Sequence, residues 1–307
     1  MVNFVIIDMG LNSVRMAIYQ IDAAGHYREI KRMKNDTRLS EGMGSKNILQ
    51  FSAMKRTIAA LKRFKAEYNK LPNVTVQAIA TAAVRQAQNQ QDFLNNIKTE
   101  IGINVRVLTG KEEAYFDYEG VVNRLKIRDY VLMDIGGASV EIIHVRNKKA
   151  INLVSLPTGA VKMTERFHLE NKITAVDFFS AQQYMIETYS KISWLRHPVH
   201  YPIVLIGGAA RTLARINRRQ QHFKQIDQIQ DYQLTRKQIN ATMRIFLSDD
   251  LAQRQSINGL DSDRADVIVG GLINLTSVMD FIDSKRVIFS DGGVREGIIN
   301  EFVQRYL

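Results

Sequence analysis

Two segments of the sequence share a pattern in which an apolar run ends on an aspartate and a glycine turn follows. FVIIDMGLNSVRMAIY begins at Phe4, and YVLMDIGGASVEIIHV begins at Tyr130. The alignment pairs Asp8 with Asp134, and a glycine, a serine and a valine match in the turns. A carboxylate is costly inside an apolar core unless something compensates its charge. Each aspartate is therefore expected at a strand end, where it faces a polar ligand or a metal ion.

Two further glycine pairs occur in the second half of the chain. PIVLIGG ends at Gly208 and RVIFSDGG ends at Gly293, and in each a short β-rich run precedes the pair and a helical pattern follows. This arrangement lets main-chain N–H groups approach an anion at a helix N-terminus. One glycine pair is usually only a turn, but four strand-ending turns of related design favour an anion-binding function.

The elements that must position these turns indicate a layered α/β fold. Both aligned segments are typical of a β-hairpin, so the hairpin is an internal repeat. The first half predicts further strands at 26–33, 74–80 and 103–108, and helices at 51–68, 92–100 and 111–125. The second half predicts a strand at 152–156 and helices near 175–194, 209–218, 235–247 and 262–281. Strands that alternate with helices favour a layered sheet over a barrel or a bundle.

Length and composition fit a protein of two domains with sizeable cores, because the chain has 307 residues and is 45% hydrophobic. The absence of cysteine excludes disulfides and thiolate zinc sites, and it suits a reducing compartment. The start lacks the basic region of a signal peptide, and the apolar run at 266–280 is shorter than the ~20 residues of a membrane span. We therefore expect a cytoplasmic protein with no membrane partner.

The formal net charge of +11 favours a polyanionic partner. Nucleic acid, phosphate esters, polyphosphate and an acidic membrane all fit this charge, and a merely solvated basic surface is an equal alternative. The basic residues cluster in two places, at Lys31, Arg32, Lys34 and Arg38 and again at Arg211, Arg215, Arg218, Arg219 and Lys224.

The duplicated hairpin resembles the phosphate loops of the actin, Hsp70 and sugar-kinase superfamily. Within it, nearly the whole chain resembles the short form of the exopolyphosphatase and guanosine pentaphosphate phosphohydrolase family. The resemblance rests on IDMGLNSVRM, LSEGMG, ATAAVRQAQN, TGKEEAYFDYEGV, MDIGGASVEII, SLPTGAVKMTERF, IGGAARTLA, RADVIVGG and GGVREGII. It implies two ribonuclease-H-like α/β domains, 1–124 and 125–307, with an active-site cleft between them. The C-terminal helix 294–307 can pack on the first domain, and the resemblance also implies a homodimer that does not bind nucleic acid.

The family reaction removes a terminal phosphate from polyphosphate, or the 5′ γ-phosphate from guanosine pentaphosphate, by attack of water with Mg²⁺ or Mn²⁺. The resemblance makes Glu113 the catalytic residue that orients the water, and it leaves Glu112 to helix electrostatics. The implied metal ligands are Asp8, Asp134 and Glu141, which are hard oxygen donors. The implied phosphate-binding residues are Gly10, Asn12, Ser13, Arg15, Arg85, Gly136, Gly137, Ser139, Gly207 and Gly208. For Arg15, a solvent-facing strand position is an equal alternative.

The sequence departs from the family pattern at three turn positions. Ala138 and Val140 replace a glycine and a threonine, and Leu11 replaces a serine. An alanine still leaves an amide donor if its φ is negative, but it fails where the turn requires positive φ. The departures therefore predict reduced activity. Every proposed carboxylate is present, so a hydrolase is the favoured interpretation. A non-catalytic sensor of polyphosphate or a guanosine alarmone, and an ATPase or kinase of the same superfamily, are the alternatives. The basic clusters favour polyphosphate, since such a track would release counterions.

Overall fold

The computed structural model describes residues 1–44 and 46–306, and the chain forms two compact units. The first unit comprises residues 1–113 together with the residues from 298 onward, and the second comprises residues 114–297. The chain therefore passes between the units twice, once inside α4 (Gly110–Val121) and once inside α11 (Val294–Tyr306). The domain boundary expected after residue 124 stays a prediction.

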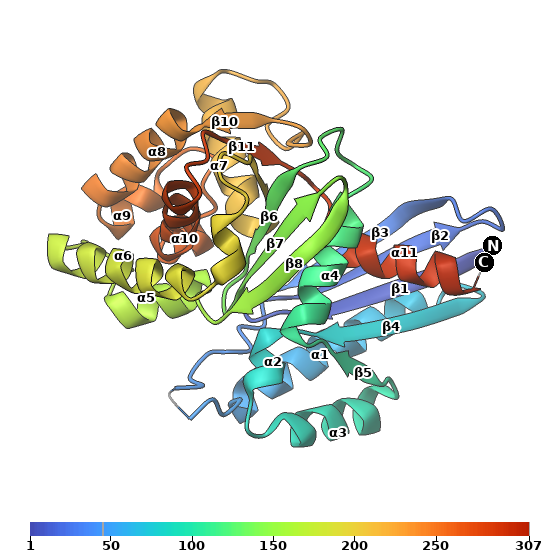
Figure 1. The fold of residues 1–307 in the computed structure, drawn as a ribbon. Coiled ribbons are helices and arrows are strands. Elements are labelled where there is room, and N and C mark those ends of the chain that lie inside the picture. Colours follow the sequence, from blue (N-terminus) through green and yellow to red (C-terminus); the bar gives the residue numbers. More distant parts are fainter. Residues whose placement is uncertain (45, 307) are drawn as a thin grey trace. The chain divides into compact units, whose positions relative to one another are not determined.

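The first unit contains a five-stranded sheet in the order β3-β2-β1-β4-β5 (Figure 1). The strands are β1 (Val2–Met9), β2 (Val14–Ile21), β3 (Tyr27–Asn35), β4 (Val74–Ala80) and β5 (Val105–Val107). The first three pair antiparallel, as expected for the hairpin and its third strand, and β4 and β5 continue the sheet in parallel. The helices before α4 are α1 (Phe51–Tyr68), α2 (Ala82–Gln86) and α3 (Gln90–Ile101).

The second unit repeats this strand order in a six-stranded sheet, β8-β7-β6-β9-β11-β10. Its strands are β6 (Tyr130–Ile135), β7 (Val140–Arg146), β8 (Lys149–Leu156), β9 (Ile203–Ile206), β10 (Gln233–Thr235) and β11 (Arg286–Phe289). Its helices are α5 (Ala160–Phe167), α6 (Ala175–Ser190), α7 (Gly207–Gln220), α8 (Arg236–Ser248), α9 (Leu251–Gln255) and α10 (Ile268–Phe281), with 3₁₀ turns η1 (Ser193–Arg196) and η2 (Ser262–Arg264). The internal repeat inferred from the two hairpins thus extends to five strands of each sheet, and β10 is an additional edge strand.

Helices pack on both faces of each sheet, and alternate residues of a strand point to opposite faces. In the first unit, Val5 and Ile7 pack in one core with α1 and α3. Phe4, on the other face, stacks on Phe302 of α11 with ring centroids 4.1 Å apart. In the second unit, Met133 belongs to the core with α5 to α8 and α10, whereas Leu132 packs with α4.

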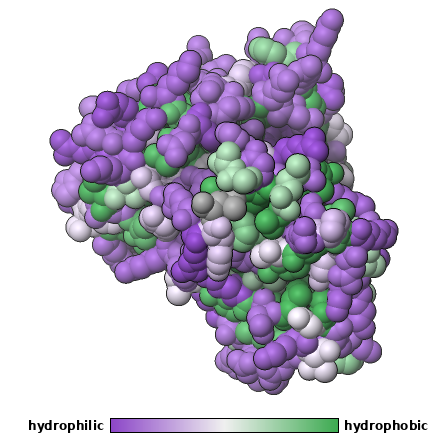
Figure 2. Space-filling view, turned by 90° about the vertical axis from the view of Figure 1, so that its right-hand side faces the viewer, coloured by the Kyte–Doolittle hydropathy of each residue, from purple (hydrophilic) through white to green (hydrophobic). Residues whose placement is uncertain are grey.

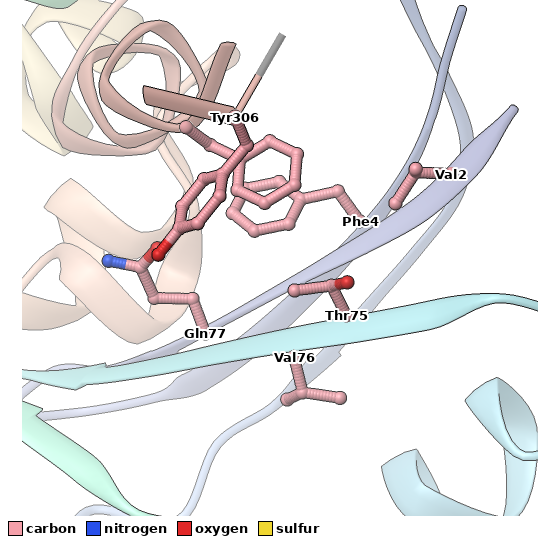
Figure 3. A pocket seen from close by; sticks show the side chains of 7 residues that line it. Val2, Phe4, Thr75, Val76, Gln77 and Tyr306 are labelled. Atoms are coloured by element: carbon pink, nitrogen blue, oxygen red, sulfur yellow. The ribbon is translucent and has the colours of Figure 1, made fainter. Parts of the chain in front are cut away.

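The face of the first sheet beneath α11 also holds a pocket of about 440 Å³. Figure 3 shows Phe4, Thr75 and Gln77 on the side of Tyr306, while Val76 points to the opposite side of the sheet. The pocket therefore lies where the end of α11 meets the central strands β1 and β4.

Hydrophilic side chains dominate the molecular face in Figure 2, with apolar residues exposed in patches. Among residues 1–44 and 46–306, no helix combines the length and the apolar character that crossing a bilayer requires.

Candidate functional site

The two hairpins have the same turn geometry. The Gly10 amide donates to the Ser13 carbonyl over 3.1 Å, and the Gly136 amide donates to the Ser139 carbonyl over 3.0 Å. Each bond closes the turn one residue after a strand that carries an aspartate as its penultimate residue. The duplication seen in the residue types is therefore a duplication of structure.

The carbonyl groups of the first turn face the protein. Leu11 and Asn12 accept hydrogen bonds from the Ser40 and Arg38 amides, over 3.1 and 2.8 Å. In a trans peptide the N–H points opposite to the C=O of the same unit. The amides of Asn12 and Ser13 therefore point away from the segment that binds these carbonyls.

The second turn has the same polarity with a different partner. The carbonyls of Gly136, Gly137 and Ala138 accept from the amides of Ala160, Val161 and Gly159 at the start of α5, over 2.9, 2.9 and 3.3 Å. The N–H groups of Gly137, Ala138 and Ser139 consequently point away from α5. Successive amides on one side of a turn form a concave site for an anion.

None of the three departures from the family pattern strains the backbone. Leu11, Ala138 and Val140 all lie outside the left-handed region, so no glycine is required at these positions. The close approach at Ala138 is accommodated by Gly159, where an added Cβ would lie 2.5 Å from the Ala138 main chain. Ala138 thus keeps its amide as a donor, and backbone strain gives no reason for reduced activity.

The carboxylates of the second hairpin lie on one face of the sheet. Asp134 pairs directly with Glu141 across β6 and β7, and directly paired residues share a face. Glu141 is 1% exposed and accepts a 2.6 Å hydrogen bond from the Ser155 hydroxyl. Two like charges in this position repel each other. A divalent cation would offset the repulsion, and carboxylate oxygens are the ligands that Mg²⁺ prefers, so the donor set fits such an ion.

The third predicted ligand, Asp8, belongs to the other unit. It pairs directly with Arg15, so the guanidinium stem emerges on the same sheet face as the aspartate. This face is the one that carries Phe4, four residues earlier in the strand. Within the part of the chain that the structure describes, no group of three or more His, Cys, Asp or Glu side chains is gathered closely enough to hold a metal ion. The complete ligand set stays a prediction.

The predicted glycine turn at Gly207 and Gly208 forms the junction between β9 and α7. Gly207 has φ +80°, and an added Cβ would lie 2.1 Å from Asp134 Oδ1. Gly208 is covered by Arg264, whose Nη1 would be 2.0 Å from an added Cβ. Both glycines are thus needed to bring a carboxylate and a guanidinium against the start of α7.

The other glycine pair has a packing role. An added Cβ on Gly292 would meet the Gly120 carbonyl oxygen at 2.3 Å, and one on Gly120 would meet the Gly293 carbonyl oxygen at 2.1 Å. These contacts bring the main chain of α4 against the loop after β11. Close backbone packing explains why glycines occur at this pair, and anion binding there stays a prediction.

Glu112 and Glu113 have different surroundings. The Glu112 carboxylate accepts from the Thr109 amide over 2.8 Å, and the Glu112 amide donates to the Thr109 hydroxyl over 3.1 Å, which is a capping box. Hydrogen bonds from Arg106 and then from the Thr109 main chain lower the pKa of Glu112 to about 2. Glu112 therefore has the electrostatic role at the helix N-terminus.

Glu113 forms a largely buried ion pair with Arg85. One guanidinium nitrogen of Arg85 donates to Glu113 Oε2 over 2.9 Å and to the Leu108 carbonyl over 2.7 Å. The side chains of Arg85 and Glu113 are 21% and 12% exposed. Arg85, predicted to bind phosphate, thus also fixes the carboxylate predicted to orient water.

The basic clusters form a less continuous surface than the sequence suggests. Arg218 is 8% exposed, donates to the Gln225 carbonyl and lies over the Phe223 ring. Its guanidinium is therefore used in packing within the second unit. Arg215 pairs with two aspartates. In the other cluster, Lys31, Arg32 and Lys34 each pair with a nearby carboxylate. For Arg218, the expected place in a solvent-facing basic track is wrong.

Sequence reasoning missed several residues that shape the site. Three residues that are not among the predicted site residues contact them: Arg264, Gly159 and Ser155. The contact of Ser155 with Glu141 results from the pairing of β8 with β7, and the predicted strand at 152–156 could have indicated it. Arg264 is 56 positions after Gly208, and no local pattern connects the two.

Comparison with known proteins gives a consistent result over the whole chain. A model described as the Ppx/GppA phosphatase family matches residues 17–306. A bifunctional 3-dehydroquinate synthase/phosphatase of Fusobacterium nucleatum is 28% identical over 96% of this chain and 46% of its own length. A guanosine-5′-triphosphate,3′-diphosphate pyrophosphatase of Photobacterium profundum is 29% identical over 97% of this chain and 59% of its own. The chain thus spans about half the length of these curated relatives.

Solved structures agree with the architecture. An exopolyphosphatase from Cytophaga hutchinsonii superposes with a TM-score of 0.91 over 98% of both chains at 24% identity, a likeness that concerns the fold alone. A Ppx/GppA family member from Aquifex aeolicus gives a TM-score of 0.84 at 27% identity, over 100% of this chain and 99% of its own. The expected fold, two α/β units of the actin-like type, is confirmed.

Proposed function

Because the chain belongs to the Ppx/GppA phosphatase family, we propose that it is a metal-dependent phosphohydrolase that removes the terminal phosphate from inorganic polyphosphate. Guanosine pentaphosphate is proposed as a second substrate, with loss of its 5′ γ-phosphate. The observation that carries the proposal is the pair of turns whose carbonyls are bound by the protein and whose amides point the other way. Such amides suit a substrate made of consecutive phosphates.

The turn amides, the Glu113 and Arg85 pair, and the predicted metal ligands have separate roles in this proposal. The amides of the first turn, at Asn12 and Ser13, and those of the second turn bind phosphate oxygens and stabilise charge in the transition state. Glu113 accepts a hydrogen bond from the attacking water, and Arg85 holds that carboxylate in place. Mg²⁺ or Mn²⁺, held by the predicted carboxylates, would neutralise charge on the phosphate oxygens.

The test measures phosphate release with Mg²⁺ from long-chain polyphosphate, guanosine pentaphosphate and ATP in parallel. Glu113→Gln keeps the size of the side chain but is a far weaker acceptor for a water proton, so kcat should fall roughly 100-fold or more. Binding of polyphosphate should persist in this variant, as measured by calorimetry.

Two results would contradict the proposal. If the parent binds polyphosphate or guanosine tetraphosphate without releasing phosphate from any substrate, the protein is a sensor. If ATP is turned over in preference to the other two substrates, it is an ATPase or a kinase.

A further inference from the structure

The first turn of α4 has side-chain contacts in addition to its capping box. Besides the Thr109 bonds, Arg106 Nη2 donates to Glu112 Oε1 over 2.9 Å. The other guanidinium branch, Nη1, donates to Glu301 Oε2 over 3.0 Å. We call Arg106, Glu112 and Glu301 the Arg106 network. Glu113 follows Glu112 directly, and its amide donates to the Thr109 carbonyl over 3.0 Å.

The position of Arg106 follows from strand alternation. Val105 and Val107 contact the core that contains α1 and α3, so Arg106 between them emerges on the opposite face. That face is covered by α11, where Glu301 precedes the Phe302 that stacks on Phe4. A single guanidinium thus ties strand β5, the start of α4 and helix α11 together inside the first unit.

We propose that Arg106 and Glu301 are positioning residues for Glu113. The catalytic part of this inference rests on the proposed function, but the structural part does not. The first N–H groups of a helix, here those before Glu113, have no intrahelical acceptors and depend on side chains for partners. The planar fork of arginine fixes two carboxylates at defined angles, which lysine does not. Small displacements of a catalytic group cost rate even when substrate binding is unchanged.

Hydrolysis kinetics test the catalytic part. Arg106→Gln removes both contacts, and kcat should fall about tenfold with KM unchanged. Glu301→Gln removes one partly exposed contact, and kcat should fall about twofold to fivefold. Arg106→Lys, which keeps the charge but not the fork, should recover part of the loss. The control is Glu100→Gln, because Lys62 and Glu100 form an exposed ion pair in the same unit, 2.7 Å long, that does not involve α4.

Amide hydrogen exchange tests the structural part without any substrate. Glu112, Glu113 and Ala114 should exchange faster in Arg106→Gln and Glu301→Gln, and at the parent rate in Glu100→Gln. Unchanged exchange and unchanged kcat in both network variants would overturn the proposal, and so would a rise in KM with kcat constant. If the parent releases no phosphate, the proposed function fails, and the exchange rates alone then decide whether the Arg106 network orders Glu113.

Discussion

At the residue scale, the position of Asp134 in the second hairpin requires that residue 207 have no side chain. Gly207 leaves the space in which the Asp134 carboxylate lies, and its φ of +80° is unfavourable for any L-residue. These two requirements can be separated, because Gly102, the C-cap of α3, has the same φ of +80° with only the Lys65 amine at 3.8 Å from an added Cβ.

Gly102→Ala should lower the free energy of unfolding by about 1–2 kcal/mol, which is the cost of the left-handed conformation alone. Gly207→Ala should lower it further and should also reduce phosphate release at least about tenfold, because the new methyl group displaces Asp134. Urea unfolding and substrate turnover measure the two effects. Equal losses of stability and of turnover in both variants would show that Asp134 does not need its place beside Gly207.

At the scale of the elements, one arginine joins four segments of the second unit. Arg254 is 0% exposed, and all five of its N–H donors reach main-chain carbonyls. The acceptors are Phe246, Asp249, Glu170, Asn171 and Ala265. Burial lowers the pKa of Arg254, although nearby carboxylates oppose the shift. The carbonyl at residue 265 follows η2, so this side chain also fixes the segment that brings Arg264 over Gly208.

Replacing Arg254 by Met should lower the free energy of unfolding by at least about 3 kcal/mol, since several buried carbonyls would lose their donors at roughly 1–3 kcal/mol each. Arg244→Met, on the exposed side of α8, should change it by less than about 0.5 kcal/mol. Denaturant melts of both variants check the difference. A similar, small change in both would mean that water replaces the guanidinium at little cost.

Sequence reasoning was most successful where elements are long and periodic. Strand β4 and helix α1 have the predicted limits, and α11 begins at the predicted residue. The last residue of that predicted helix, Leu307, lies outside the described residues. The shorter elements α2, α5, α9 and β10 were not predicted, because three to eight residues do not establish a period. The predicted helix at 262–281 begins as a 3₁₀ turn and becomes α-helical only at Ile268.

The sequence predicts the residue types of the candidate site but not the contacts between them. The aspartates and glycines stand inside local patterns, whereas the partners of Glu113 and Gly208 lie 28 and 56 positions away in the sequence. Only the folded sheet brings such residues together, so no window of the sequence contains the information.

At the scale of the whole molecule, the net charge of +11 should govern how substrates of different length respond to salt. Binding of a polyanion releases counterions, so the logarithm of the affinity falls linearly with the logarithm of the salt concentration. The slope is proportional to the number of phosphates contacted. The KM for long-chain polyphosphate should therefore rise more steeply with NaCl than the KM for tripolyphosphate. Steady-state assays over a series of salt concentrations compare the slopes. Equal slopes would confine recognition to the terminal phosphates and leave the wider basic surface without a role in binding.

The two passages of the chain between the units also affect how the protein is made. The second unit is one continuous segment, 114–297, whereas the first lacks the residues from 298 onward until the rest has been synthesised. Until then Phe4 has no Phe302 to stack on, and Arg106 has no Glu301. Domains usually mature on the ribosome in the order of their synthesis. Here that order is reversed, since the unit that emerges first is completed last, and the sheet face that carries Phe4 stays uncovered by α11 in the interval.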